Sequence, residues 1–477
     1  MNPEFRRNLW IELTGPRIAL AVGVPAILLL AVWLRPGHDI TLINNISILL
    51  YNLGAFIGGP RRAANSIAIE VRGRTWEGQV MSALSAWSMT WGKLLGGCAL
   101  VWISALICLG SSLAIELQIF PTGTALGNAG LRIFTAFAAQ AVAFCSALII
   151  LRKSAAGKSL NSTLSQAVGL IAAAIFGLAF APTVTQYSWM WTVFEQQSGF
   201  DLSIAWYGLQ ADGNLFRVVS LAIFVGWTWL AANRLMRHVL QYSSMPWAWP
   251  AFVIFMVVYF GGFFSAGAGS SGWVAAGFFI VAWLTYPAAL SDVKDAVAYG
   301  WLRRDLSAGR WRNALQRMPA WMPTLAILLV FGIAVAVSAP FSSLSALRVD
   351  DFEGLGDLLT SGAWLSSSLM LAILLFVIRD LGIIHLLAFS DAGRYSDVVA
   401  VIVLIALYLV IPIAGSAAGS AAMVAAFLPL DLGDPAVTLG PVAVEAVATT
   451  IAARAMARRA ARPPRPATGS AGASAAA

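Results

Sequence analysis

Apolar runs separated by short polar stretches recur along the whole chain. Runs of about 17–22 apolar residues match the hydrocarbon thickness of a bilayer. Backbone groups in lipid must be paired within their own segment, so the runs predict helices and an all-α polytopic membrane protein. Twelve crossings are expected, at 18–34, 43–59, 94–115, 133–151, 162–181, 215–233, 250–266, 273–290, 323–339, 362–378, 398–413 and 436–453.

The twelve runs form two sets of six, and each run of the second set starts 221 to 236 residues after its counterpart. In both sets a long basic connection follows the second run, and a long connection follows the fifth. This pattern favours two pseudo-repeated halves, 1–240 and 241–460, as in many transporters, followed by a disordered tail at 461–477. A bundle of evenly packed helices without duplication is the alternative, because it also gives even spacing.

Composition excludes a water-soluble domain, since 59% of residues are hydrophobic, 11% are charged and the mean hydropathy is +0.78. The net charge of +8 does not indicate nucleic-acid binding, because 26 of the 30 Lys and Arg residues fall in segments on one side of the expected topology. The exceptions are Arg35, Arg132, Arg217 and Arg348. This asymmetry predicts that both termini are cytoplasmic and that the basic surface faces anionic lipids.

The connection at 70–93, EVRGRTWEGQVMSALSAWSMTWGK, has the strongest local pattern. After a charged start, an apolar stripe recurs at helical spacing through Trp76, Val80, Leu84, Trp87 and Trp91. The pattern predicts a helix near 76–91 at the cytoplasmic membrane surface. We expect its apolar face to bind a second protein.

This connection resembles the signature of type-2 ABC transporter permeases, the membrane subunits of ATP-driven exporters. The matching residues are Glu70, Arg74, Thr75, Glu77, Leu84, Ser85, Gly92 and Lys93. The start of the chain (Asn2, Pro3 and Glu12) and a basic patch (Arg152, Lys153 and Lys158) are also similar. The sequence departs from the family at Ala83, where a turn proline is usual, and at Gly78. Over 241–477 only topology and basic charge are similar.

The resemblance implies a permease subunit in the inner membrane of a bacterial cell, belonging to an exporter that moves an unidentified substrate. Residues of 70–93, including Trp76 and Trp87, would couple it to a cytoplasmic ABC ATPase dimer, and part of 291–322 would provide a second contact. ATP and Mg would be bound by that partner, so the chain itself is expected to be neither an enzyme nor a cofactor-binding protein. Gly157-Lys158-Ser159 imitates the end of a Walker A motif, but Arg152 occupies the position of its first glycine. The resemblance also implies short re-entrant helices within 182–214.

Glu445 is the one acid well inside an expected crossing. Intramembrane acids are costly and often functional, so the alternative function is a secondary transporter driven by an ion gradient. That class would place charges or broken helices at mid-depth in both halves. The structural alternative for Glu445 is a paired carboxylate facing other helices.

Other polar residues give weaker signals. Glu116 is interpreted as a solvated helix boundary. Asn44, Asn45 and Asn52 on the second run are interpreted as forming interhelical hydrogen bonds or part of a polar pathway. No metal site is expected, because the histidines and cysteines lack ligand spacing: His38, His238, His385, Cys98, Cys108 and Cys145. A membrane enzyme acting on lipid-linked substrates is a third class, but no clustered acids or histidines support it.

Overall fold

A computed structural model describes residues 2–36, 39–82, 84–155, 196–198, 201–242, 246–338, 367–390, 396–419, 424, 426–429 and 435–460. In this part of the chain nine helices are long and apolar enough to cross a membrane, or ten if a pair bent by 100° is one span. The all-α polytopic membrane fold is therefore confirmed. The count of twelve crossings stays a prediction, since the run at 162–181 lies outside the described residues.

The chain divides into two compact units, 1–269 and 270–477. The expected boundary at 240/241 differs, because the division falls inside α11 (Ala248–Ser291). The reason is aromatic packing. On the first part of α11, Phe255 contacts both Phe224 and Trp227 of α10 (Gly213–Val239), with ring centroids 5.7 and 5.5 Å apart. This arm of α11 therefore belongs to the first unit.

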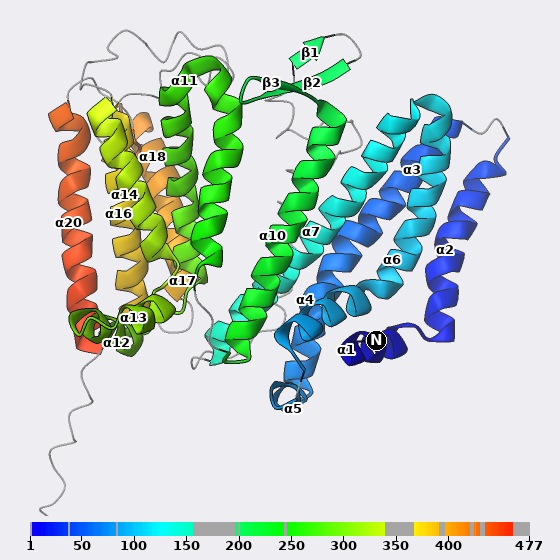
Figure 1. Cartoon of the computed structure of the whole chain (residues 1–477), viewed down its shortest axis with the longest axis horizontal. Coiled ribbons are helices and arrows are strands. Elements are labelled where there is room, and N and C mark those ends of the chain that lie inside the picture. Colours follow the sequence, from blue (N-terminus) through cyan, green and yellow to red (C-terminus); the bar gives the residue numbers. More distant parts are fainter. Residues whose placement is uncertain are drawn as a thin grey trace, which may run out of the picture. The chain divides into compact units, whose positions relative to one another are not determined.

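The first unit is a bundle of long helices with a short helix, α1, lying across one end (Figure 1). Asn2 caps α1 by accepting a hydrogen bond from the Glu4 amide, and Pro3 occupies the first helical position. The other elements are α2 (Gly15–Trp33), α3 (Ile40–Asn52), the π-helix η1 (Leu53–Gly58), α4 (Gly59–Arg72), α5 (Trp76–Val80), α6 (Ala86–Ile119) and α7 (Thr122–Ala155), with α1 spanning Pro3–Glu12.

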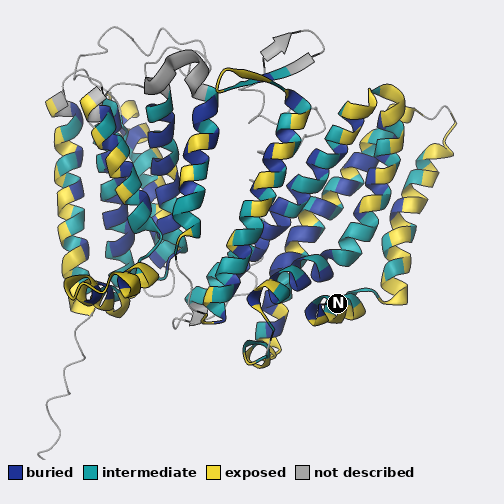
Figure 2. Ribbon diagram, in the orientation of Figure 1, coloured by how far each residue is buried: buried dark blue, intermediate teal, exposed yellow. Residues whose placement is uncertain are grey.

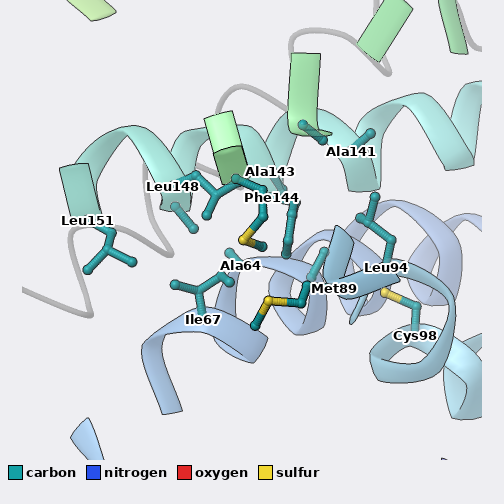
Figure 3. Close-up of a cluster of buried hydrophobic side chains, with 14 of the residues drawn as sticks. Ala64, Ile67, Met89, Leu94, Cys98, Ala141, Ala143, Phe144, Leu148 and Leu151 are labelled. Atoms are coloured by element: carbon teal, nitrogen blue, oxygen red, sulfur yellow. The ribbon is translucent and has the colours of Figure 1, made fainter. Parts of the chain in front are cut away.

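The core of the first unit lies where α4, α6, α7 and α10 pack side by side. Ile67 of α4, Met89 of α6 and Phe144 of α7 are almost completely buried there, among many alanines (Figure 3). Small side chains let membrane helices approach closely and gain dispersion contacts. By contrast, α2 is mostly exposed along its length, as expected for a helix that faces lipid (Figure 2).

A three-stranded antiparallel sheet precedes α10: β1 (Gln196–Ser198), β2 (Asp201–Trp206) and β3 (Leu209–Asp212). The prediction of re-entrant helices within 182–214 is therefore wrong over 196–198 and 201–212, and residues 182–195, 199 and 200 lie outside the described chain. The two-residue turn between β2 and β3 has positive φ at both Tyr207 and Gly208. Positive φ at both positions is the requirement of a type I′ turn, whose twist matches that of the two strands. The indole N–H of Trp206 donates to the Tyr259 carbonyl at 2.9 Å, which docks the hairpin on α11.

The second unit comprises the rest of α11 and the helices that follow it. These are α12 (Ala296–Ser307), α13 (Trp311–Arg317), α14 (Trp321–Ser338), α16 (Ser367–Phe389), α17 (Ser396–Ile405), the π-helix η5 (Ala406–Val410), α18 (Ile411–Ala417) and α20 (Pro435–Ala460). Among the described elements of this unit, the most extensive helix–helix packing is between α16 and α20. The crossing expected at 362–378 is shifted, because α16 continues to Phe389. Arg379 and Asp380 consequently lie in the middle of a helix and not after its end.

Candidate functional site

The predicted helix near 76–91 is two separate helices in the structure. After α5 ends, the chain turns and α6 begins at Ala86. Serine side chains explain the break: the Ser82 hydroxyl donates to the Gln79 carbonyl at 2.7 Å, and the Ser85 hydroxyl accepts from the Ser88 amide at 3.2 Å. Such local bonds compete with a continuous helix. Arg74, with a φ of 54°, makes the preceding turn out of α4.

The apolar stripe predicted to face a partner instead divides between two surroundings. Trp76, Val80 and Leu84 are partly buried and pack against the core of the first unit. Two large apolar side chains stay exposed, Met81 at 87% and Trp87 at 49%. Together with the exposed side chains of Arg74, Thr75 and Glu77 they form what we call the turn surface. It is made by Arg74, Thr75, Glu77, Met81 and Trp87.

Beneath the turn surface, Lys93 is completely buried at the centre of an ion cluster. Its ammonium nitrogen donates to Glu4 at 2.8 Å and to Glu70 at 2.5 Å. Arg7 also bonds both carboxylates, at 2.9 Å from Glu4. We call these four residues the Lys93 cluster. The two positive charges of Lys93 and Arg7 balance the two negative charges of Glu4 and Glu70. Buried charges are tolerated only when they are paired in this way.

Glu4 is held in its ionised form by the Lys93 cluster. Burial by itself raises the pKa of this carboxyl, but the charges of Lys93 and Arg7 and hydrogen bonds from Lys93 and Asn8 together lower it below its ordinary value. Glu4 therefore carries a negative charge at neutral pH. It ties α1 to α6 electrostatically.

Glycine allows α1 to lie directly on α6. A Cβ atom at Gly92 would come within 2.9 Å of the Glu4 Cβ, and one at Gly96 within 2.8 Å of the Asn8 Cβ. The Asn2 side chain completes the contact by donating to the Ser88 carbonyl at 2.6 Å. Gly92 thus has a packing role beside the ionic role of its neighbour Lys93.

The predicted coupling residues form two groups. Glu70, Thr75 and Lys93 are brought together, since the Thr75 amide donates to the Glu70 carbonyl at 3.0 Å. The Gln79 amide group also reaches the Glu70 carboxylate at 2.7 Å, which fastens α5 to α4. The exposed group is Arg74, Glu77 and Trp87 of the turn surface, to which Thr75 also belongs by its exposed side chain, and Ser85 serves as the cap of α6.

Glu445 belongs to a second set of charged residues, inside the second unit. Its carboxylate accepts from the Arg379 guanidinium at 3.0 Å. Arg379 also bonds Asp380, at 3.0 Å from Nε. The hydroxyls of Tyr286 and Tyr408 donate to Asp380 at 2.7 and 2.5 Å. Glu445 is therefore not the one acid inside a crossing, because Asp380 lies within α16 and is completely buried.

Glu116 is not a solvated boundary but a buried ion-pair partner in the first unit. Its carboxylate accepts from Arg132 of α7 at 2.6 Å, and both side chains are at least nine-tenths buried. Nearby, the Ser112 hydroxyl donates to the Asn44 side chain at 2.7 Å. Asn44 thus makes an interhelical hydrogen bond between α3 and α6, as one of the two interpretations expected.

Sequence reasoning missed the docking of α1 and the pairing of Arg379 with Asp380. Both left a signal: glycines four residues apart at Gly92 and Gly96, and an Arg-Asp pair inside the apolar run 367–389. Among the described residues no three or more His, Cys, Asp or Glu side chains are grouped as metal ligands. Comparisons with known protein families, with curated proteins and with solved structures give no match.

Proposed function

We propose that the chain is the membrane-spanning permease subunit of an ATP-driven, ABC-type transporter. The observation that carries the proposal is the turn surface, which presents exposed apolar and charged side chains at the end of the first unit. Large exposed side chains in a connection between membrane-spanning helices and in the first turn of the next helix favour a protein partner. That partner would be a separate cytoplasmic ATPase, in line with the type-2 permease pattern at 70–93.

Force applied at the turn surface would pass to the membrane through Glu70 and Lys93. Gln79 and Thr75 fasten the turn to Glu70, and Lys93 links Glu70 to α6. With 34 residues, α6 is about 50 Å long, so it reaches across a bilayer. A displacement of α5 would therefore tilt α4 and α6 together rather than bend a loose loop.

The second unit offers a further contact in the helical hairpin α12–α13. Trp301 and Trp311 are 48% and 65% exposed on this hairpin, and Arg303 is exposed as well. The inner side is fixed by Asp305, which pairs with Arg310 at 2.8 Å. We propose this hairpin as the second ATPase contact, within the expected range 291–322.

The same proposal places α1 at the cytoplasmic membrane surface of a bacterial cell. Trp10 and Ile11 are exposed at 73% and 55%, and the Arg6 guanidinium lies 5.5 Å from the Trp10 ring centroid. A tryptophan beside a cation suits the headgroup region of a bilayer. Both termini would then be cytoplasmic and the surrounding partner would be membrane lipid. Export of an unidentified substrate follows from the resemblance.

The test is purification of the tagged full chain from its native membranes in mild detergent. We expect a stoichiometric chain that contains a Walker A motif and hydrolyses ATP. Glu77→Arg with Trp87→Arg should abolish this association, whereas Leu209→Arg, exposed in β3, should leave it intact. An ATPase that stays bound to the Glu77 and Trp87 variant would refute the assignment of the turn surface.

An ion-gradient-driven secondary transporter is the second candidate, and one observation favours it. Charged pairs lie inside membrane-spanning helices of both units, Arg132 with Glu116 and Arg379 with Asp380. The π-helices η1 and η5 also interrupt spans in both units, and such segments are frequent at functional sites. Transport that survives ATP depletion and stops when the ion gradient is collapsed would select this candidate over the permease.

A further inference from the structure

We propose that Glu445 is the exchangeable proton-binding group of an intramembrane site formed by Arg379, Asp380 and Glu445. This inference holds whichever energy source drives transport, because it concerns charge inside the second unit. It rests on the contacts of the three side chains and on their depth in the membrane-spanning helices.

The site lies far from both ends of its helices. Arg379 and Asp380 are near the middle of α16, and Glu445 is ten residues from the start of α20. At 1.5 Å per residue that start is about 15 Å away, half the thickness of the hydrocarbon. An uncompensated charge at this depth is costly.

The charge of Arg379 is compensated by Asp380. One Asp380 oxygen accepts from Arg379, and the other accepts from the hydroxyls of Tyr286 and Tyr408. Both oxygens of this carboxylate are therefore already engaged as hydrogen-bond acceptors. Arg379 is almost completely buried and lies 2.9–3.0 Å from Asp380, so these two residues form a neutral pair.

Glu445 is therefore one negative charge in excess. It touches the pair through a single hydrogen bond, from Arg379 to Oε2 at 3.0 Å. Its side chain is 32% exposed, whereas Asp380 is completely buried. Binding one proton would make the whole site neutral, and the uncovered edge of Glu445 gives that proton a way in and out.

The elements packed on α20 supply no further cation next to Glu445 in the described chain. The main ones are α16, which contributes Arg379 and Asp380, and α12, whose charged residues are Arg303, Arg304 and Asp305. The α12 contact is a small one, and Asp305 of that helix pairs with Arg310 and Arg317. The arginines of α20 itself begin at Arg454, more than two turns away.

When Glu445 loses its proton, the O–H bond breaks, the electron pair stays on the carboxylate oxygen and the proton is taken up by a carrier, a water molecule or another base, that reaches the exposed edge from outside the site. Arg379 donates to Oε2 in both states.

Infrared spectroscopy of the full chain in lipid nanodiscs tests the proposal, because a protonated carboxylic acid has a carbonyl stretching band that a carboxylate lacks. We expect a band in the wild-type chain that disappears as pH rises and that is absent from Glu445→Gln. Glu77→Gln, at an exposed carboxyl, is the matched control and should keep the band. Glu445→Asp should keep a shifted band, which covers the case in which the glutamine variant fails to fold.

Three results would overturn the inference. One is a wild-type chain without a titrating carboxylic acid band over the pH range in which it stays folded. Another is a band that persists in a folded Glu445→Gln variant and is lost in Asp380→Asn. The third is a band that responds to added sodium at fixed pH and not to pH itself, which would assign the site to a metal cation.

Discussion

A single ammonium group at Lys93 holds carboxylates from two other elements, Glu4 of α1 and Glu70 of α4. Since Lys93 is completely buried, its charge cannot be taken over by water when a partner is lost. Buried pairs of this kind contribute little net stability when intact, yet breaking one by removing a partner is strongly destabilising. The Lys93 cluster is thus a point at which one substitution affects three elements.

The substitution Lys93→Met should lower the free energy of unfolding by about 3–5 kcal/mol, because it leaves two buried carboxylates facing only Arg7. Equilibrium unfolding in mixed micelles, followed by circular dichroism, measures the change. Arg61→Met, at an exposed position next to α4's start, is the control and should shift stability by no more than about 0.5 kcal/mol.

Replacing Glu4 and Glu70, the carboxylates that lose their partner in Lys93→Met, by glutamine should restore part of the lost free energy of unfolding. The triple variant Lys93→Met, Glu4→Gln, Glu70→Gln removes the uncompensated charge while keeping similar side-chain shapes. If Lys93→Met alone were as stable as the wild-type chain, the ion cluster would have no structural importance.

Acid should release α1 through Glu4. The pKa of Glu4 in the folded chain lies below its ordinary value of 4.5, so the stabilisation is complete above 4.5 and is lost as pH falls below it. Hydrogen exchange of the α1 amides, corrected for the intrinsic effect of pH, should show protection falling in this acid range. In Glu4→Gln the acid step should be missing, and an unchanged step would assign it to another group.

Some residues singled out from the sequence are brought together in the structure, but the sequence did not predict their neighbours. Glu70, Gly92 and Lys93 were singled out from the sequence, and the structure places all three at the contact with α1. Helical periodicity identified Trp76 and Leu84 but gave them the wrong neighbours, because periodicity cannot tell an inner apolar face from an outer one. Asp380 was missed since the end of its helix was placed too early.

At the scale of elements, the contact between α1 and α6 depends on the absence of side chains at Gly92 and Gly96. Gly92→Ala with Gly96→Ala should destabilise this contact by about 1–3 kcal/mol, since both new Cβ atoms would overlap α1. Gly110→Ala on the same helix meets nothing within 4 Å and should stabilise by up to about 1 kcal/mol.

Thermal unfolding of the two glycine variants in the same detergent makes the comparison direct. Because all three positions are in α6, helix propensity favours alanine equally in each case. Only the steric overlap with α1 differs. If the Gly92→Ala, Gly96→Ala variant and the Gly110→Ala variant changed the unfolding temperature equally, α1 would not be packed on α6.

The crossing helices were predictable because each crossing requires a long apolar run, and that requirement leaves a continuous signal in the sequence. Shorter elements depend on individual contacts. The break between α5 and α6 follows from the hydrogen bonds of Ser82 and Ser85, and the hairpin at β2 and β3 from its docking through Trp206. Such contacts carry no periodicity, so a helix was expected at the first place and re-entrant helices at the second.

For the whole molecule, orientation in the membrane is the property on which every proposed contact depends. The turn surface and the hairpin α12–α13 reach an ATPase only if both are cytoplasmic, and the sheet preceding α10 must then be on the outer side. The basic residues of α12 and α13, Arg303, Arg304, Arg310, Arg312 and Arg317, agree with a cytoplasmic position for that hairpin.

Cysteine labelling in cells checks this orientation directly. Cys98 and Cys108 are buried and Cys145 is partly buried, so background reaction should be low. With a membrane-impermeant maleimide, Leu209→Cys should react in intact cells, whereas Glu77→Cys and Ser307→Cys should react only after the membrane is opened. All three positions are exposed in the structure, so access to reagent and not burial decides the result. Labelling of Glu77→Cys in intact cells would place the turn surface outside, where no ATPase could bind it.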